Sequence, residues 1–438
     1  KIKQKEMKRF FSALAGILFG AATICGAADR EHTLKIYNWA DYIDEALLDE
    51  FKTWYREQTG EEVEIIYQLF DVNEIMLSKI ELGHEDFDVV CPSEYIIERM
   101  LRQNLLLKID TDFGKTPNYI SGIAPYIREK FNEIEGSGKN ANDYAVGYMW
   151  GTTGLLYNPK YVTKEEASTW ECLKNPKFKN KIFIKDAFRD VYTALTIALH
   201  KKEIDSGELN IKDITFNASD EYIALVEDFL NQVKGNVLGW EADFGKEEMT
   251  KEKAWINLDW SGDAQWAIEE AAKIGVKLDY EVPHEGSIVW FDGWVIPKYA
   301  KNIQAARYFI NYMCMPENAL RNMDEIGYVS AVGGDEILNS ITDTAAYSPI
   351  DASYFFGEKA KAVCINPIQY PDASIMARCG MMHDNGDRTE ALLKMWSRVK
   401  GDNAGYFTYI CIAVAVIAVI IVVILNSRKK KGGKKRRK

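Results

Sequence analysis

Hydrophobic and polar positions change period several times in the first hundred residues. A short apolar run over 34–37 and the polar–apolar alternation over 62–67 predict two strands. The continuous apolar run over 87–91 is typical of a strand buried in a parallel sheet, and helical spacing over 73–81 precedes it. Helical spacing also follows the first strand, at Ile43, Leu47, Leu48, Phe51 and Trp54. This β-α-β-α order predicts an α/β fold.

The middle of the chain repeats the same alternation and predicts a second lobe. A long strand over 145–157 contains the run GTTG at 151–154, and glycines inside a strand often mark a bend or a close backbone approach. Further strands are predicted over 181–185, 253–258, 276–281 and 287–296, and helices over 190–200, 220–233, 262–272, 302–313 and 317–326. Between residues 330 and 400, helical spacing is clear only over 390–399.

The stretch YNWADY at 37–42 lies where the first predicted strand ends. Ligands of open α/β sheets collect outside the carboxyl ends of the strands. Trp39 and Tyr42 flank Asp41, and this combination suits an apolar body that carries positive charge, such as an organic amine. The alternative is that Trp39 and Tyr42 are core residues and that Asp41 caps the next helix.

The same chemistry recurs at other strand ends. Trp260 is followed by Asp263, and Trp290 is followed by Asp292. Packing alone is a poor explanation for this recurrence, because a buried carboxylate is costly unless a partner accompanies it. Ser93 and Tyr95 close a further strand, although Ser93 taken alone is most simply a helix cap.

Both ends of the chain differ from its body. Residues 1–28 combine a basic start, an apolar run and small residues, which indicates a signal peptide or an N-terminal anchor. The uncharged, apolar residues 406–425 match the length of a transmembrane helix. The basic residues over 426–438 then predict a cytoplasmic tail and an extracytoplasmic body.

Composition narrows the class of protein. The 438 residues are 47% hydrophobic and 27% charged, enough for two globular domains with full cores. The net charge is −11 although both ends are basic, so the body is strongly acidic and favours cations over nucleic acid. The seven cysteines show no metal-binding spacing, and of the five outside the apolar ends at most two pairs could form disulfides. We expect no metal and no cofactor.

An enzyme is not expected. The five histidines are scattered, and no serine-hydrolase, zinc-protease or phosphate-binding glycine motif occurs. A surface hydrolase that uses Asp and His is therefore the weaker alternative.

Six ordered stretches together resemble the polyamine-binding receptors of ABC importers, which bind spermidine or putrescine. The stretches are YNWADY at 37–42, VCPS at 90–93, YMWGTTG at 148–154, WSGD at 260–263, WFD at 290–292 and IGY at 326–328. The resemblance extends over roughly residues 33–400. It implies a type II periplasmic-binding fold of two lobes, with lobe 1 over 33–145 and 290–330, lobe 2 over 146–289 and 331–400, and the ligand in the cleft between them.

The resemblance also implies the residues of the site. The aromatic and hydroxyl residues would line the methylene chain or hold its ends, and the acids would contact the amines. They are Trp39, Asp41, Tyr42, Ser93, Tyr95, Asp190, Trp260, Asp263, Trp290, Asp292 and Tyr328. Ala40, Cys91 and Glu94 depart from the family pattern, and Glu94 leaves the charge count of the cleft open.

The implied function is that of a solute-binding protein. The protein would be a monomer that captures a polyamine, putrescine in preference to spermidine. It would deliver this polyamine to the permease of an ABC importer. The alternatives are a receptor of the same fold for another cationic solute, or a membrane-tethered polyamine sensor.

Overall fold

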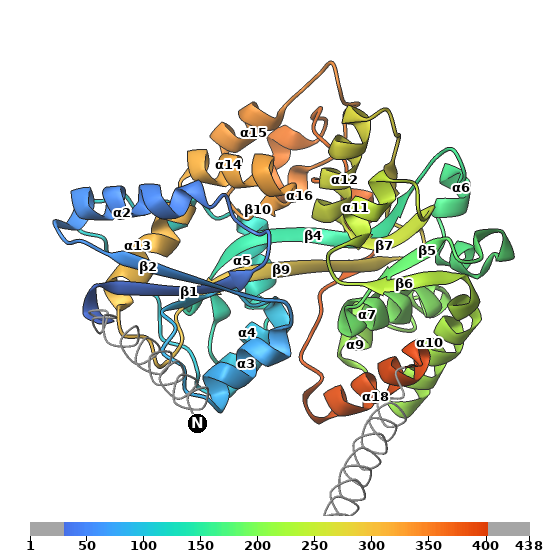
Figure 1. Cartoon of the computed structure of the whole chain (residues 1–438), viewed down its shortest axis with the longest axis horizontal. Coiled ribbons are helices and arrows are strands. Elements are labelled where there is room, and N and C mark those ends of the chain that lie inside the picture. Colours follow the sequence, from blue (N-terminus) through green and yellow to red (C-terminus); the bar gives the residue numbers. More distant parts are fainter. Residues whose placement is uncertain (1–29, 402–438) are drawn as a thin grey trace, which may run out of the picture.

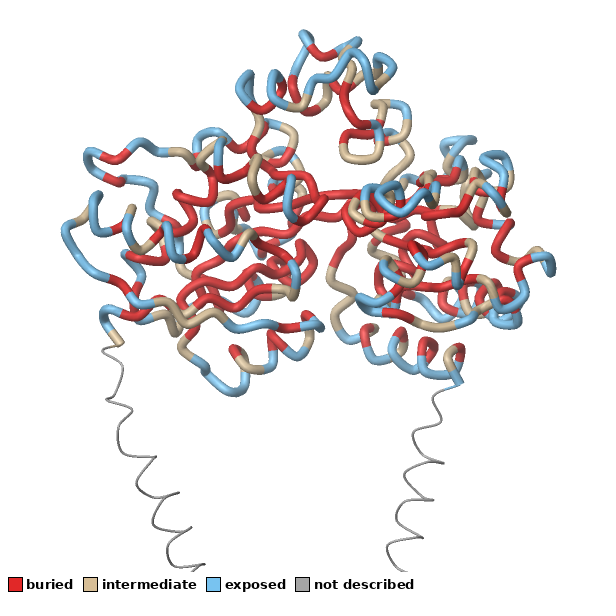
Figure 2. The backbone as a smooth tube through the Cα atoms, turned by 45° about the horizontal axis from the view of Figure 1, so that its top comes forward, coloured by how far each residue is buried: buried red, intermediate tan, exposed pale blue. Residues whose placement is uncertain are grey.

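The structure is a computed structural model that describes residues 30–401. Figure 1 shows two lobes, joined by two long strands that run through the middle of the molecule. These crossing strands are β4 (Ala145–Tyr157) and β9 (Ser287–Val295), which pair with each other antiparallel. Figure 2 shows buried backbone in both lobes and along the strands that join them.

Lobe 1 is built around three parallel strands. They are β1 (Thr33–Trp39), β2 (Glu64–Phe70) and β3 (Val89–Val90), and the helices of this lobe are α2 (Ala46–Thr59), α3 (Asn73–Glu81), α4 (Glu94–Arg102), α5 (Pro125–Asn132) and α13 (Ile303–Met313). Leu47, Leu48, Phe51 and Tyr55 bury one face of α2, as the helical spacing predicts. The chain leaves α2 at Gly60, whose φ of 79° favours glycine.

Lobe 2 repeats the parallel arrangement. Its strands are β5 (Ile182–Lys185), β6 (Val237–Glu241) and β7 (Ile256–Trp260), and its helices are α6 (Lys164–Ala167), α7 (Phe188–Leu199), α8 (Lys201–Asp205), α9 (Ile211–Phe216), α10 (Asp220–Val233), α11 (Gly245–Thr250), α12 (Ser261–Lys273) and α18 (Thr389–Lys400). The spatial order of the main strands is β2-β1-β3-β9-β4-β7-β5-β6. β9 meets lobe 1 at β3, and β4 meets lobe 2 at β7.

The remaining strands pair with the two crossing strands, and the remaining helices lie late in the chain. β8 (Asp279–Glu281), β10 (Val329–Ser330) and β11 (Cys379–Gly380) pair with the crossing strands. The helices are α14 (Pro316–Ile326), α15 (Asp335–Ile341), α16 (Ser353–Phe356) and α17 (Ala373–Met376). The predicted lobe boundaries, at 145/146 and 289/290, fall within β4 and β9. These strands run through both lobes, so the boundaries stay predictions.

The glycines of β4 do not interrupt the strand, which is buried along its whole length. At Gly151, an added Cβ would lie 2.5 Å from Ser261 Oγ and 2.6 Å from the Trp290 ring. The glycine therefore marks a close approach, the second of the two predicted meanings, and it brings α12 and β9 against β4.

One part of the expected fold is corrected. The two-lobed α/β body is confirmed, but no helix within residues 30–401 is long and apolar enough to cross a membrane. Even α2 and α10 have only 14 residues each, whereas a bilayer needs about 20 apolar residues. The transmembrane helix predicted over 406–425, the signal or anchor segment over 1–28 and the basic tail over 426–438 all lie outside the described residues.

Candidate functional site

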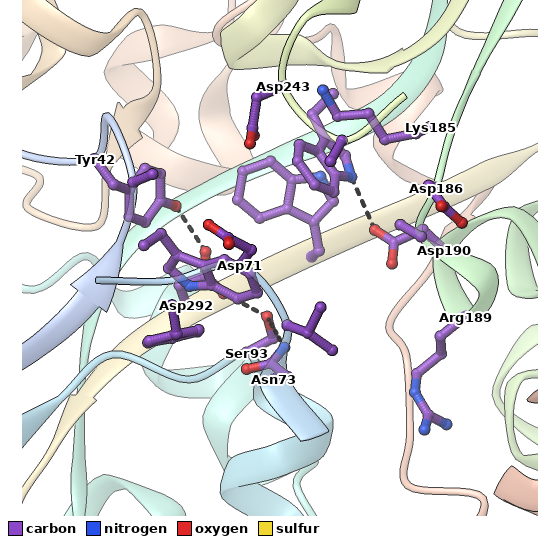
Figure 3. Close-up of a pocket in the computed structure, with 18 of the residues that line it drawn as sticks. Tyr42, Asp71, Asn73, Ser93, Lys185, Asp186, Arg189, Asp190, Asp243 and Asp292 are labelled. Carbon is purple, nitrogen blue, oxygen red and sulfur yellow. Dashed lines mark hydrogen bonds between the residues drawn. The ribbon is translucent and has the colours of Figure 1, made fainter. Parts of the chain in front are cut away.

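A cavity lies between the lobes, with a volume of about 1040 Å³ that includes solvent at its mouth. Its walls come from β1, α4, α7, β7, α12 and β9 and from the turns that adjoin them (Figure 3). Every one of the eleven residues predicted from the sequence lines this cavity: Trp39, Asp41, Tyr42, Ser93, Tyr95, Asp190, Trp260, Asp263, Trp290, Asp292 and Tyr328. The structure thus brings the separate strand ends into one place.

The sheet explains why they meet. Trp39 ends β1 in lobe 1 and Trp260 ends β7 in lobe 2, and ligands of α/β sheets collect outside the carboxyl ends of the strands. Three antiparallel pairings separate the two strands in the sheet, so β1 and β7 run in opposite directions and their carboxyl ends both reach the cavity between the lobes. Asp292 lies in the crossing strand β9, directly opposite Ser93 in an antiparallel bridge. The crossing strand therefore carries one acid to the edge where lobe 1 ends.

Asp292 is a buried carboxylate, and its hydrogen-bond donors within residues 30–401 are neutral hydroxyl groups. The Tyr42 hydroxyl donates to Asp292 Oδ2 at 2.7 Å, and the Ser93 hydroxyl donates to Oδ1 at 2.7 Å. Burial raises the pKa of Asp292 to about 6, against the effect of these hydrogen bonds. At neutral pH the carboxylate is ionised and has no cationic partner in these contacts.

Asn73 supports this acid from behind. Its Nδ2 donates to Ser93 Oγ at 3.0 Å and to the Tyr95 hydroxyl at 2.9 Å. Asn73 Oδ1 is buried and has no hydrogen-bond partner within residues 30–401. Asn73 also lines the cavity, and through its amide it fixes the Ser93 hydroxyl that donates to Asp292.

Asp190, in the first turn of α7, is the second acid with a neutral donor. The Trp260 indole Nε1 donates to Asp190 Oδ1 at 2.9 Å. Burial raises the pKa of Asp190 to about 6. The charge of the adjacent Arg189 opposes this rise in the pKa of Asp190. The Arg189 guanidinium lies over the Tyr95 ring at 4.3 Å, and its Nη2 is 3.4 Å from a Glu74 carboxylate oxygen.

Aromatic rings form the apolar walls. Trp290 and Tyr328 meet edge to face with ring centroids 5.5 Å apart, and Tyr42 meets Tyr328 at 5.1 Å. Tyr328 fits because Gly262 has no side chain: an added Cβ there would lie 2.2 Å from the tyrosine ring. The glycine of the WSGD stretch is therefore needed for the shape of the cavity.

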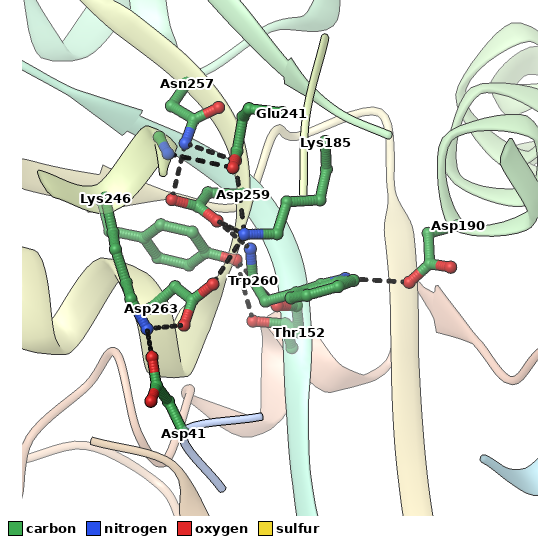
Figure 4. A network of polar contacts seen from close by, with 12 residues as sticks. Asp41, Thr152, Lys185, Asp190, Glu241, Lys246, Asn257, Asp259, Trp260 and Asp263 are labelled. Carbon is green, nitrogen blue, oxygen red and sulfur yellow. Dashed lines mark hydrogen bonds and ion pairs between the residues drawn. The ribbon is translucent and has the colours of Figure 1, made fainter. Parts of the chain in front are cut away.

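Asp263 differs from the other two buried acids, because ammonium groups of the chain hold it (Figure 4). Lys185 Nζ donates to Asp263 Oδ2 at 2.6 Å, and Lys246 Nζ donates to Oδ1 at 3.3 Å. Burial opposes ionisation, but these two lysines lower the pKa of Asp263 below its usual value. Lys246 also lies 4.0 Å from Asp41, whose side chain is 80% exposed at the cavity rim.

Glu94 is not among the residues that line the cavity. It is fully buried beneath the site, where its carboxylate oxygens accept hydrogen bonds from the backbone N–H groups of Phe291 and Met382. Burial raises the pKa of Glu94 well above its usual value, against the effect of the backbone hydrogen bond from Phe291.

Comparison with known families decides the class of protein. The family model for bacterial extracellular solute-binding proteins matches residues 46–334. This chain belongs to that family. Members of the family are solute-binding proteins and not enzymes, so the hydrolase alternative is dropped.

Relatives of this solute-binding protein support the resemblance seen in the sequence. The spermidine/putrescine-binding periplasmic protein of Escherichia coli (strain K12) is 26% identical over 325 residues, which are 74% of this chain and 84% of the relative. The putrescine-binding periplasmic protein of the same strain is 25% identical over 90% of this chain and 98% of its own length. Among solved structures, a putative spermidine/putrescine ABC transporter protein from Listeria monocytogenes is 28% identical, with a TM-score of 0.63 over 84% of this chain and 99% of that chain.

Several residues that line the cavity were missed at the level of the sequence. Asp71 follows Phe70 at the end of β2, so the rule of an aromatic next to an acid at a strand end would have found it. Asp243 follows β6, a strand that the periodicity did not predict because most of its residues are only partly buried. Lys185, the last residue of β5, was inside a correctly placed strand but was given no role.

Proposed function

We propose that this solute-binding protein captures a polyamine in the cavity between its lobes. Asp190 and Asp292 would contact ammonium groups, and the rings of Trp39, Trp290 and Tyr328 would flank the methylenes. The observation that carries the proposal is the pair of buried carboxylates whose hydrogen-bond donors are neutral, beside aromatic walls. A buried anion without a cationic partner is costly, and a ligand cation removes that cost.

A linear diamine suits this arrangement. It consists of two ammonium groups joined by an apolar chain, and a cation over an aromatic face contributes about 0.5–2 kcal/mol. Putrescine has about six heavy atoms, so a ceiling of about 1.5 kcal/mol per atom limits its binding free energy to about 9 kcal/mol. We therefore expect a Kd near or somewhat below micromolar.

The names of the relatives support a polyamine but allow both spermidine and putrescine. We propose that putrescine is preferred. The protein would act outside the cytoplasm, as a monomer, and deliver its ligand to the permease of an ABC importer. Deletion of that permease should abolish uptake of the polyamine; uptake that persists would contradict the delivery step.

Isothermal titration calorimetry tests the binding proposal directly. The protein is titrated with putrescine, cadaverine, spermidine and spermine at pH 8, where Asp190 and Asp292 are ionised. We expect a single site for putrescine with a Kd near micromolar. If none of the four amines binds, the proposal of a polyamine ligand is refuted. The alternative is then a receptor for a different cationic solute.

A further inference from the structure

The cavity wall contains an ammonium group that belongs to the protein itself. Lys185 Nζ lies 2.6 Å from Asp263, 3.2 Å from Asp259 and 3.2 Å from Glu241. Its side chain is 1% exposed, and the ammonium lies 4.4 Å from the centroid of the Trp260 ring (Figure 4). Lys185 therefore has carboxylate partners and an aromatic face, which are the contacts that an amine ligand would need.

We propose that Lys185 is a specificity-determining residue: its ammonium fills the cation subsite at Asp263, so the cavity selects a diamine over a triamine. This inference rests on the proposed polyamine function. A ligand would then bring its ammonium groups to Asp190 and Asp292 and not to Asp263. A third ammonium directed at Asp263 would meet a carboxylate that Lys185 already holds.

The lysine is fixed in place by the sheet. It is the last residue of β5, and the neighbouring strands β6 and β7 supply Glu241 and Asp259. Burial disfavours the ammonium form, but the three acids raise the pKa of Lys185 well above its usual value. A ligand amine could replace this lysine only by moving a charged group away from three carboxylates in a buried setting.

The second oxygen of Asp263 is occupied as well. Lys246, on α11, donates to Oδ1, so the two oxygens of this carboxylate each have an ammonium partner from the chain. Within residues 30–401, the side chains that donate to Asp190 and Asp292 are the Trp260 indole and the Tyr42 and Ser93 hydroxyls, none of which is charged. Of the four acids that the sequence groups together, Asp190 and Asp292 are thus available to a ligand cation and Asp263 is not. The fourth, Asp41, is exposed at the cavity rim, 4.0 Å from Lys246.

The substitution Lys185→Met should change this selectivity. Methionine has a similar length but no charge, so Glu241, Asp259 and Asp263 would lose their shared ammonium partner. Both Lys185 and Asp263 line the cavity, so the subsite is reached from the space that holds the ligand. The third ammonium of spermidine could then take the place of Lys185 over Trp260.

The test is the ratio of spermidine affinity to putrescine affinity, measured by calorimetry at pH 8 for the unsubstituted protein, for Lys185→Met and for the control Lys181→Met. Lys181 directly precedes the same strand, but its Nζ contacts the Lys253 carbonyl and the Trp255 ring, away from the cavity. We expect the ratio to rise at least tenfold in Lys185→Met and to stay unchanged in Lys181→Met. A ratio within threefold of the unsubstituted value in Lys185→Met would overturn the inference.

A second measurement serves if Lys185→Met does not fold. In a crystal structure of the unsubstituted protein with spermidine, Lys185 Nζ should still contact Asp263. A spermidine ammonium bound to Asp263 in place of Lys185 would overturn the inference. The two proposals fail differently: a protein that binds none of the amines refutes the polyamine function and the inference with it, whereas polyamine binding with an unchanged ratio refutes the role of Lys185 alone.

Discussion

The substitution Asp292→Asn removes one charge from the cavity and changes little else. Asp292 Oδ1 and Oδ2 each accept one hydroxyl hydrogen bond, from Ser93 and Tyr42. The amide has the same shape, and the Tyr42 hydroxyl can rotate to accept from the new NH₂ group. We therefore expect the variant to fold, and to lose affinity for the diamine.

The magnitude follows from the contact that is lost. A hydrogen bond to a charged group contributes about 1.5–3 kcal/mol, which corresponds to a loss of affinity of about 10- to 150-fold. The bare Coulomb energy of a pair about 4 Å apart is about 4 kcal/mol at an effective dielectric constant of about 20, before desolvation is subtracted. We expect the loss of binding free energy to lie in the range of about 1.5–3 kcal/mol rather than near the Coulomb energy, because the cost of desolvating the charges offsets part of the Coulomb attraction.

The assay is calorimetry with putrescine at pH 8, well above the pKa of about 6 for Asp292, so that the unsubstituted carboxylate is fully ionised. Asp143→Asn is the matched control, because Asp143 is a half-exposed acid paired with Lys108 outside the cavity. Its affinity for putrescine should equal that of the unsubstituted protein. If Asp292→Asn keeps its fold and its affinity stays within threefold, Asp292 does not contact the ligand amine.

Three further predictions follow from the same geometry. Putrescine affinity should fall between pH 8 and pH 5, because Asp190 and Asp292, each with a pKa of about 6, become protonated. The fall should be roughly tenfold for each acid and roughly a hundredfold for both together, and an affinity that does not depend on pH would contradict this. Gly262→Ala should weaken binding at least tenfold, because its Cβ would displace Tyr328, and Gly235→Ala, where nothing lies within 4 Å, is the control for calorimetry. Putrescine at about 100 times its Kd should add about 2.7 kcal/mol to the free energy of unfolding, measured by denaturant titration; no stabilisation would indicate no binding to the folded state.

The raised pKa values of Asp190 and Asp292 also affect the protein without ligand. Their pKa in the folded protein, about 6, exceeds the ordinary value of 3.8. The unfolded chain therefore releases these protons first as the pH rises. Between about pH 4 and pH 6 these two groups make the free energy of unfolding decrease with increasing pH.

Much of the site could be predicted from the sequence because of one rule. Ligands of α/β sheets collect outside the carboxyl ends of the strands, so an aromatic next to an acid at several strand ends predicts a shared site. Trp39 and Trp260 end β1 and β7 and line the cavity as this rule predicts. Asp292 also lines the cavity, but it lies inside the antiparallel strand β9 and not at a strand end. The long strand β4 and the helices α3 and α10 also have the predicted boundaries.

The sequence did not predict which acids are already paired with a lysine of the chain, because these partners come from other strands and helices. Asp263 looks like Asp292 in the sequence, yet Lys185 from β5 and Lys246 from α11 bind it. Strand β6 was not predicted, because its residues are mostly half-buried and show no clear alternation. Glu241, which contacts Lys185, and Asp243, which lines the cavity, were therefore missed. Pairing across strands depends on sheet order, which periodicity does not contain.

A crystal structure of the protein with putrescine tests the central claim most directly. We expect the diamine inside the cavity, with its ammonium nitrogens within hydrogen-bond distance of Asp190 and Asp292 and its methylenes against Trp290 and Tyr328. Putrescine bound outside the cavity, or inside it with both ammonium groups away from these two carboxylates, would contradict the claim.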